Sequence, residues 1–225
     1  MSERVIVVTG GQGVLGRAVV RQALADGARV AAVDRAPASA LGEAMVLGGV
    51  DLTDPVSAGE AMGRIADQLG GVDALLNIAG GFAWQTTEAG DPATWDRMFA
   101  MNVRTTLTAV RAALPHLLRS PAGRIVNVGA AGAVKAAAGM GAYAASKAGV
   151  HRLTESLAEE LKDSGLTVNA VLPSIIDTPQ NRADMPDADP ARWVDPEDLA
   201  AVMLFLASPA ARAVTGALVP VTGRV

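Results

Sequence analysis

The sequence contains no cysteine, and it has only two histidines, His116 and His151. Disulfides, thiolate catalysis and cysteine-based metal sites are therefore excluded, and so is a histidine-rich metal site. We predict no metal centre. Aromatic residues make up only 3% of the chain, so the core must be built from alanine, valine, leucine and isoleucine.

Clusters of positive charge and long apolar runs are also missing. The chain has 19 Lys and Arg against 23 Asp and Glu, and no basic cluster. This argues against a binder of nucleic acids or anionic membranes. No apolar run approaches the ~20 residues of a membrane span, and residues 1–4 lead into an apolar strand pattern without a signal peptide. We expect a cytoplasmic protein that acts on a small molecule, with neither nucleic acid nor membrane as partner.

The 225 residues alternate between short apolar runs and longer helical stretches, which predicts one domain over residues 1–225. Strands are predicted at 5–8, 29–33, 45–50, 74–78, 124–128, 167–172 and 217–221. Helices are predicted at 13–26, 55–69, 92–118 (kinked at Pro115), 143–162 and 196–207, with Asp54, Asp91 and Asp195 as N-caps. The pattern predicts an α/β fold, a doubly wound parallel sheet of about seven strands with helices on both faces. Residues 173–195, rich in Pro and Asp, are predicted to form a substrate lid at the carboxyl end of a strand.

A glycine-rich loop lies between the first strand and the first helix. Its residues are Gly10, Gly11, Gln12, Gly13, Val14, Leu15 and Gly16, with the spacing Gly-x-Gly-x-x-Gly from residue 11. In this context the backbone can approach a pyrophosphate, which the helix N-terminus then faces. Asp34 ends the second strand and can accept hydrogen bonds from both ribose hydroxyls of NAD. The adjacent Arg35 could hold a phosphate, so NAD is favoured and NADP stays open.

The only tyrosine, Tyr143, lies four residues before Lys147, so both fall on one face of a helix. A nearby ammonium favours the phenolate form and lowers the pKa of a phenol from its usual value near 10. Such a pair can exchange a proton with a substrate oxygen near neutral pH. The alternative is a buried aromatic residue beside a surface lysine.

Several motifs occur in order along nearly the whole chain. They are the glycine loop, Asp51-Leu52, Asn77-Ile-Ala-Gly80, Asn102, Tyr143-x-x-x-Lys147 and the C-terminal runs 192–199 and 215–219. Together they resemble the short-chain dehydrogenase/reductase family. The resemblance implies a Rossmann fold, a nicotinamide cofactor and hydride transfer. It also implies a homodimer or homotetramer paired through the helices at 92–118 and 143–162.

The resemblance assigns roles residue by residue. Tyr143 would be the general acid/base, Lys147 would bind the nicotinamide ribose and lower the tyrosine pKa, and Asn102 would hold a water in a proton relay. The remaining cofactor contacts would come from Asp51 and Leu52 at the adenine, Asn77, Ala79 and Gly80 at the adenosine ribose, and Pro173, Ser174, Ile175 and Thr178 at the nicotinamide.

One position departs from the family pattern. The family's serine, about thirteen residues before the tyrosine, is replaced by Ala130, and residues 127–132 carry no hydroxyl. Loss of such a donor costs ~10²–10³ in rate, so either the substrate does not need it, another group such as Ser174 supplies it, or the protein binds cofactor without turnover. Phe82 and Trp84 follow a strand end and could stack on a flat substrate, or simply pack the loop.

A narrower resemblance links the loop, Ala130 and the run from Leu172 to Trp193 to the dihydropteridine reductases. That branch implies reduction of a quinonoid dihydropterin with NADH. Other segments, 143–149 and 192–198, are similar to ketone and 3-oxoacyl reductases. Both substrate classes stay open, as does a catalytically weak dinucleotide-sensing protein.

Overall fold

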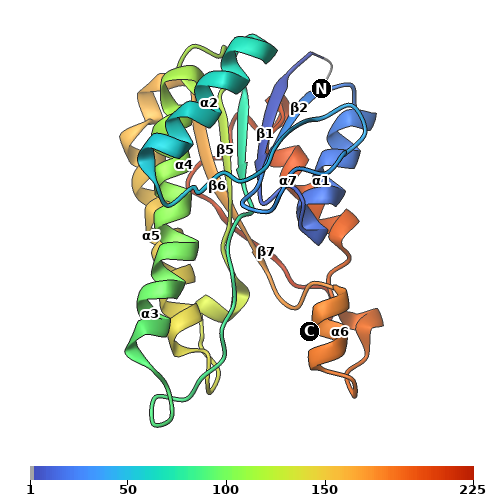
Figure 1. Ribbon diagram of the computed structural model, residues 1–225, viewed down its shortest axis with the longest axis vertical. Coiled ribbons are helices and arrows are strands. Elements are labelled where there is room, and N and C mark those ends of the chain that lie inside the picture. Colours follow the sequence, from blue (N-terminus) through green and yellow to red (C-terminus); the bar gives the residue numbers. More distant parts are fainter. Residues whose placement is uncertain (1–2) are drawn as a thin grey trace.

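A computed structural model describes residues 3–225 and places seven parallel strands in one sheet (Figure 1). The strands are β1 (Val5–Thr9), β2 (Arg29–Val33), β3 (Met45–Leu47), β4 (Ala74–Asn77), β5 (Arg124–Val128), β6 (Thr167–Pro173) and β7 (Leu218–Val221). Their order is β3-β2-β1-β4-β5-β6-β7. The predicted parallel, doubly wound sheet is confirmed, and β3 is shorter than predicted.

Helices cover both faces of the sheet because alternate strand residues point to opposite sides. Ile6 and Val8 of β1 pack in a cluster with α1 (Val14–Ala25) and α7 (Pro196–Leu206). Val5 and Val7 pack in a second cluster with α2 (Pro55–Leu69), α4 (Thr105–Leu117) and α5 (Gly141–Glu160). Both clusters consist of aliphatic residues, as the scarcity of aromatics requires.

The three predicted N-caps are confirmed. The Asp54 carboxylate accepts hydrogen bonds from backbone N–H groups of α2, Asp91 caps α3 (Pro92–Phe99), and Asp195 caps α7. Each is followed by proline at the first helical position, where the missing N–H costs nothing. These caps fix where the helices begin.

The helical region predicted over 92–118 is confirmed, and it contains a π-helical segment that the sequence does not predict. A π-helical segment, Ala100–Arg104, separates α3 from α4, and Pro115 lies inside α4 near its end. The hydroxyl of Thr106 donates to the Asn102 carbonyl (2.8 Å). This side chain gives a hydrogen-bond partner to a carbonyl in the wider π-helical turn. The irregularity therefore falls at Asn102.

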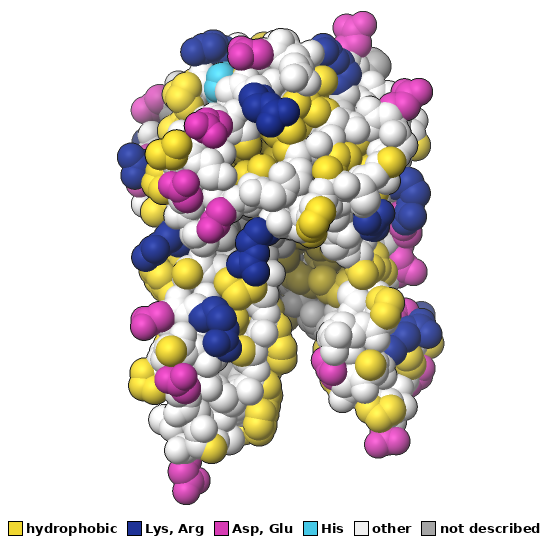
Figure 2. All heavy atoms as spheres, viewed as in Figure 1, with side chains coloured by type: hydrophobic (Ala, Val, Ile, Leu, Met, Phe, Trp, Pro, Cys, Tyr) yellow, Lys and Arg dark blue, Asp and Glu magenta, His cyan; other side chains and the backbone are white. Residues whose placement is uncertain are grey.

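The segments after β4, β5 and β6 project beyond the carboxyl end of the sheet. Figure 2 shows a deep hollow between two lobes, which Figure 1 identifies as the loops beside α3 and α5 on one side and the α6 region on the other. The predicted lid contains α6 (Pro179–Asp184) and a 3₁₀ turn, Pro190–Arg192. Between residues 3 and 225, none of the helices combines the length and apolar character that crossing a bilayer requires.

Candidate active site

The glycine loop packs too tightly for side chains at three positions. A Cβ at Gly16 would lie 2.1 Å from the Gly10 carbonyl oxygen, and one at Gly11 would lie 2.7 Å from the Ala32 Cβ. Gly10 has φ +64° and rests against the Ala79 backbone. Gly13 begins α1 with no side-chain cap, and Val14 is exposed while Leu15 is buried in the core. Uncapped N–H groups at an open helix N-terminus fit a pyrophosphate.

Asp34 lies beside this loop with its carboxylate fixed by the backbone. One oxygen accepts from the Gln12 N–H (2.9 Å) and the other from the Ala36 N–H (3.0 Å). The Gln12 side chain binds the carbonyls of Ala36 and Pro37. Each carboxylate oxygen keeps a lone pair for a ribose hydroxyl, so the placement fits the predicted role. Arg35 is exposed.

The residues expected at the adenosine lie at different depths. Asp51 is exposed, and the Thr53 hydroxyl and N–H both donate to its carboxylate, which lowers its pKa. Leu52 is buried in the core beneath it. Asn77 is only 3% exposed, and its amide donates to Asn127 (2.9 Å). Its side chain therefore supports the sheet from within and does not line the open edge.

A chain of close contacts joins the glycine loop to Lys147. The Thr9 hydroxyl accepts from the Ala79 N–H (3.2 Å), and Ala79 packs on Gly10. A Cβ at the next residue, Gly80, would lie 2.5 Å from the Asn102 Oδ1 and 3.5 Å from the Lys147 Nζ. The glycine loop and the lysine are thus linked by contacts through residues 79 and 80.

Tyr143 lies in the first turn of α5, with the Phe82 ring edge-on to its own at a centroid distance of 4.9 Å. Burial raises the pKa of Tyr143 to about 12. This is opposite to the lowering expected from Lys147, because burial removes the solvent that would stabilise the phenolate form. At neutral pH the phenol is protonated and can donate.

Lys147 follows one turn later and is 5% exposed. Its ammonium donates to the Val128 carbonyl (2.8 Å) at the end of β5, which leaves N–H groups free for a ligand. Burial lowers the pKa of Lys147 to about 8.

The side chain of Asn102 holds the loop after β4. Its Oδ1 accepts from the Gly81 N–H (2.9 Å), and its amide donates to the Gly81 carbonyl (3.1 Å) and to the Ser146 hydroxyl (2.9 Å). Ser146 in turn donates to the Tyr143 carbonyl (2.7 Å). Asn102 therefore couples the tyrosine's helical turn to the segment that carries Phe82.

The wall beside the tyrosine lacks a free hydroxyl. Ala130 is 4% exposed, and its N–H donates to the imidazole of His151 (3.2 Å). The proposed substitute, Ser174, donates its hydroxyl hydrogen to the Thr222 carbonyl (2.7 Å). Both donors, the Ala130 N–H and the Ser174 hydroxyl, are therefore already paired within the protein.

The predicted lid, residues 173–195, is held largely by contacts among its own residues. Pro173 is buried, Ser174 and Ile175 are partly buried, and the Thr178 hydroxyl caps α6. The Arg182 guanidinium binds both carboxylate oxygens of Asp177 (2.6 Å each). Trp193, near the end of this segment, is buried.

The opposite wall contains Phe82 and Trp84, which are 58% and 62% exposed. The Trp84 indole N–H donates to the Ala138 carbonyl (3.1 Å) and the ring covers Gly139, where a Cβ would lie 2.1 Å away. Trp84 thus joins the loop after β4 to the loop before α5, whereas Phe82 faces Tyr143.

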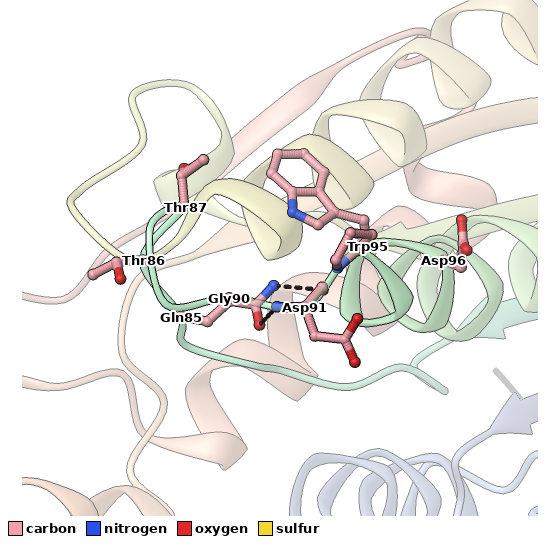
Figure 3. Close-up of a pocket in the computed structure, with 8 residues that line it drawn as sticks. Gln85, Thr86, Thr87, Gly90, Asp91, Trp95 and Asp96 are labelled. Carbon is pink, nitrogen blue, oxygen red and sulfur yellow. Dashed lines mark hydrogen bonds between the residues drawn. The ribbon is translucent and has the colours of Figure 1, made fainter.

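A separate pocket of about 410 Å³ lies between the loop after β4 and the start of α3 (Figure 3). Gln85 closes this loop, since its amide exchanges hydrogen bonds with the Asp91 backbone (3.1 Å each). Trp95 lines the pocket, and neither Tyr143 nor Lys147 does. It is therefore not the hollow that holds the tyrosine.

Three polar residues outside the predicted set of site residues support the site, and sequence reasoning gave none of them its partner. Ser146 and His151 lie on the same helix as Tyr143, and Asn127 joins Asn77 to the Thr154 hydroxyl (2.9 Å). The eight-residue spacing from Tyr143 to His151 places the histidine on the same helix, and Asn127 is a polar residue in an apolar strand. Both signals were present, but their partners come from distant segments.

Known proteins resemble the chain over almost its full length. The model of the short chain dehydrogenases matches residues 4–189. Meso-2,3-butanediol dehydrogenase of Serratia marcescens is 34% identical over 98% of this chain and 93% of that protein. The 3-oxoacyl-[acyl-carrier-protein] reductase of Vibrio cholerae is 31% identical over 98% and 96%. The crystal structure of 3-ketoacyl-(acyl-carrier-protein) reductase from Brucella melitensis complexed with NADH has a TM-score of 0.88, with 28% identity over 99% of this chain and 98% of that one.

The matched residues 4–189 include the glycine loop, Asp34 and the Tyr143–Lys147 pair. The chain belongs to the short-chain dehydrogenase/reductase family of NAD(P)-dependent oxidoreductases.

Proposed function

We propose that the hollow carries out hydride transfer between NAD(H) and a small substrate, with Tyr143 as the proton donor or acceptor. The observation that carries this proposal is the chain of close contacts from Gly10 through Ala79 and Gly80 to Lys147. It joins a pyrophosphate cradle to the acid–base pair. A nicotinamide bound there would supply or accept the hydride.

The chain's own residues would do the rest. The N-terminus of α1 binds the pyrophosphate, and the Asp34 carboxylate accepts from the ribose hydroxyls, which disfavours a 2′-phosphate. The Brucella melitensis structure, which is complexed with NADH, supports the same cofactor. Lys147 fixes the second ribose with the N–H groups that Val128 leaves free. Tyr143, protonated at neutral pH, delivers a proton to the reduced substrate atom.

For the substrate we propose a quinonoid dihydropteridine. The supporting observation is that Ala130 has no side-chain hydroxyl. Its backbone N–H already donates to His151. A quinonoid ring is already a strong electron acceptor, so it needs a second hydrogen-bond donor less than a ketone does. The exposed Phe82 ring, edge-on to Tyr143, offers a face for a flat substrate.

The second candidate is a ketone or 3-oxoacyl thioester. The relatives named as butanediol dehydrogenase and 3-oxoacyl reductase favour it. A third, a dinucleotide-sensing protein with weak catalysis, rests on Ala130 alone, and the intact Tyr143, Lys147 and Asn102 argue against it.

NADH oxidation with freshly generated quinonoid dihydropterin, and in parallel with a 3-oxoacyl ester, separates these candidates. Turnover of the pterin alone supports the first, and turnover of the ester alone supports the second. NADH binding without turnover of either supports the sensor. Ala130→Ser adds the missing hydroxyl, so it should raise ketone reduction by up to ~10²-fold and change pterin reduction little. A large gain with the pterin would contradict the proposed substrate.

We further propose that the chain is a single domain, 1–225, on which residues 173–195 act as a lid over the substrate. We propose that the protein is cytoplasmic. We also propose that it forms a homodimer or homotetramer. Trp95, Phe99 and Leu107 are 44%, 53% and 38% exposed along α3 and α4, in the region that the resemblance assigns to pairing. Size-exclusion chromatography with light scattering at micromolar concentration tests the oligomer, and a monomer would contradict it.

A further inference from the structure

His151 is a buried titratable residue for which the proposed reaction has no use. It lies on α5 two turns after Tyr143 and one turn after Lys147, and it is 3% exposed. Its Nε2 accepts the N–H of Ala130 at 3.2 Å. An accepting Nε2 assigns the proton to Nδ1, so the ring is neutral. Burial, and then the charges of Arg152 and Lys147, lower the pKa of His151, and the opposing pull of Glu155 is smaller.

The imidazole also fits closely against the backbone before Ala130. A Cβ built at Gly129 would lie 2.5 Å from the His151 Nε2 and 3.3 Å from the Leu172 side chain. While histidine occupies position 151, only glycine fits at position 129. The hydrogen bond and the close fit are two separate signs that this ring and this backbone are matched.

Three consecutive residues at the end of β5 are each held by a different group. The Val128 carbonyl accepts from the Lys147 ammonium (2.8 Å), the Gly129 N–H donates to the Val171 carbonyl (2.9 Å), and the Ala130 N–H donates to His151. Beyond this point β6 no longer pairs with the segment. His151 thus supplies the hydrogen bond to the backbone at the position where pairing with β6 has ended.

We propose that His151 is a positioning residue: its neutral ring fixes the backbone of residues 128–130, and through the Val128 carbonyl it sets the position of the Lys147 ammonium. This inference rests on the proposed function, because Lys147 matters only where it serves the hydride-transfer site. His151 touches neither substrate nor cofactor in this role. It acts through the strand end that Lys147 binds.

The test compares His151→Leu with His151→Gln. Leucine fills space but accepts no hydrogen bond, whereas the glutamine amide oxygen can replace Nε2. In His151→Leu we expect kcat per folded enzyme to fall about tenfold to a hundredfold, as for a misplacement of ~1 Å, with NADH affinity changing less. His151→Gln should recover most of the wild-type kcat. His116→Gln, at the other histidine, is the matched control and should leave kcat unchanged.

Hydrogen exchange of the peptide spanning residues 124–134 gives a readout that needs no turnover. The Ala130 amide should exchange faster in His151→Leu than in the wild type, and near the wild-type rate in His151→Gln. Wild-type kcat in folded His151→Leu, or a glutamine variant as slow as the leucine variant, would overturn the positioning role.

A Tyr143→Phe variant keeps that outcome distinct from failure of the proposed function. If Tyr143→Phe is inactive while His151→Leu is fully active, only the positioning role fails. If Tyr143→Phe turns over like the wild type, the proposed function fails, and the exchange of the Ala130 amide then decides alone whether His151 holds the strand end.

Discussion

The two halves of the hollow differ in how they are built. On the cofactor side, backbone packs on backbone: Gly10, Gly11 and Gly16 leave no room for a Cβ, and two N–H groups hold the Asp34 carboxylate. On the substrate side, Phe82 and Val134 are 58% and 74% exposed on loops. A rigid half suits a ligand shared by a family, while a wall of loops can change with the substrate. The predictions below test this division.

The largest effect on activity is expected at Tyr143, where the cofactor side and the substrate side of the hollow meet. Tyr143→Phe removes the proton donor and keeps the ring that packs on Phe82. We expect kcat to fall by about 10²–10⁴, the usual contribution of general acid catalysis. NADH affinity, measured by fluorescence titration, should stay near the wild-type value because the glycine cradle is untouched. A variant with more than a tenth of the wild-type kcat would remove Tyr143 from the chemistry.

Two glycines of the same motif should respond differently to the same substitution. In Gly16→Ala the new Cβ meets the Gly10 carbonyl oxygen at 2.1 Å, so backbone must move. We expect a loss of about 1–3 kcal/mol in the free energy of unfolding, as for overpacking, together with loss of NADH binding. Gly13 has φ −73° and no neighbour nearer than 3.4 Å, so Gly13→Ala should keep its stability.

Thermal unfolding and NADH titration of both variants check this prediction. Equal destabilisation of Gly13→Ala and Gly16→Ala would mean that the motif is constrained by its glycine content and not by the one contact with Gly10. Normal NADH binding by Gly16→Ala would contradict the cradle itself.

The same division explains how much the sequence could predict. The sheet, the caps at Asp54 and Asp91, and the glycine loop follow from local rules, because each depends on residues a few positions apart. The π-helical segment at Asn102 could not be predicted, because proline is the stronger local signal of an irregular helix. The irregularity was therefore predicted at Pro115.

Within the site, the residues of the motifs were predictable and their partners were not. The spacing of Tyr143 and Lys147 placed both on one helix face, but nothing local indicates that Lys147 binds the Val128 carbonyl or that Ala130 binds His151. The direction of the Tyr143 pKa was also missed, because burial depends on Phe82 and the whole fold. Contacts across distant segments need the tertiary structure.

Burial of Lys147 should appear as a pH dependence of stability. Its pKa is lowered from 10.5 to about 8 in the folded chain, so between these values the unfolded chain binds more protons than the folded one. The free energy of unfolding should therefore gain a contribution that rises with pH from about 8 to 10.5 and reaches on the order of 3 kcal/mol. Below pH 8 the full penalty for the buried charge remains.

Lys147→Met removes this contribution while keeping a similar shape. Urea unfolding of both proteins without cofactor, at several pH values from 7 to 10.5, gives the difference directly. We expect the variant to be the more stable one at pH 7 and the advantage to vanish near pH 10.5. A constant difference across the range would mean that Lys147 is not desolvated in the ligand-free chain.

The smallest effect is expected where the two substrate-side loops are joined. Trp84→Phe keeps an aromatic ring over Gly139 but removes the N–H that donates to the Ala138 carbonyl. Losing one exposed hydrogen bond should cost about 1 kcal/mol or less, so global unfolding should change little. Because the bond links only two loops, we expect faster amide exchange within residues 83–91 and 134–140 and a raised substrate KM, with NADH affinity unchanged. A drop in NADH affinity would instead show that the two halves of the hollow are coupled, and the division drawn between them would then be wrong.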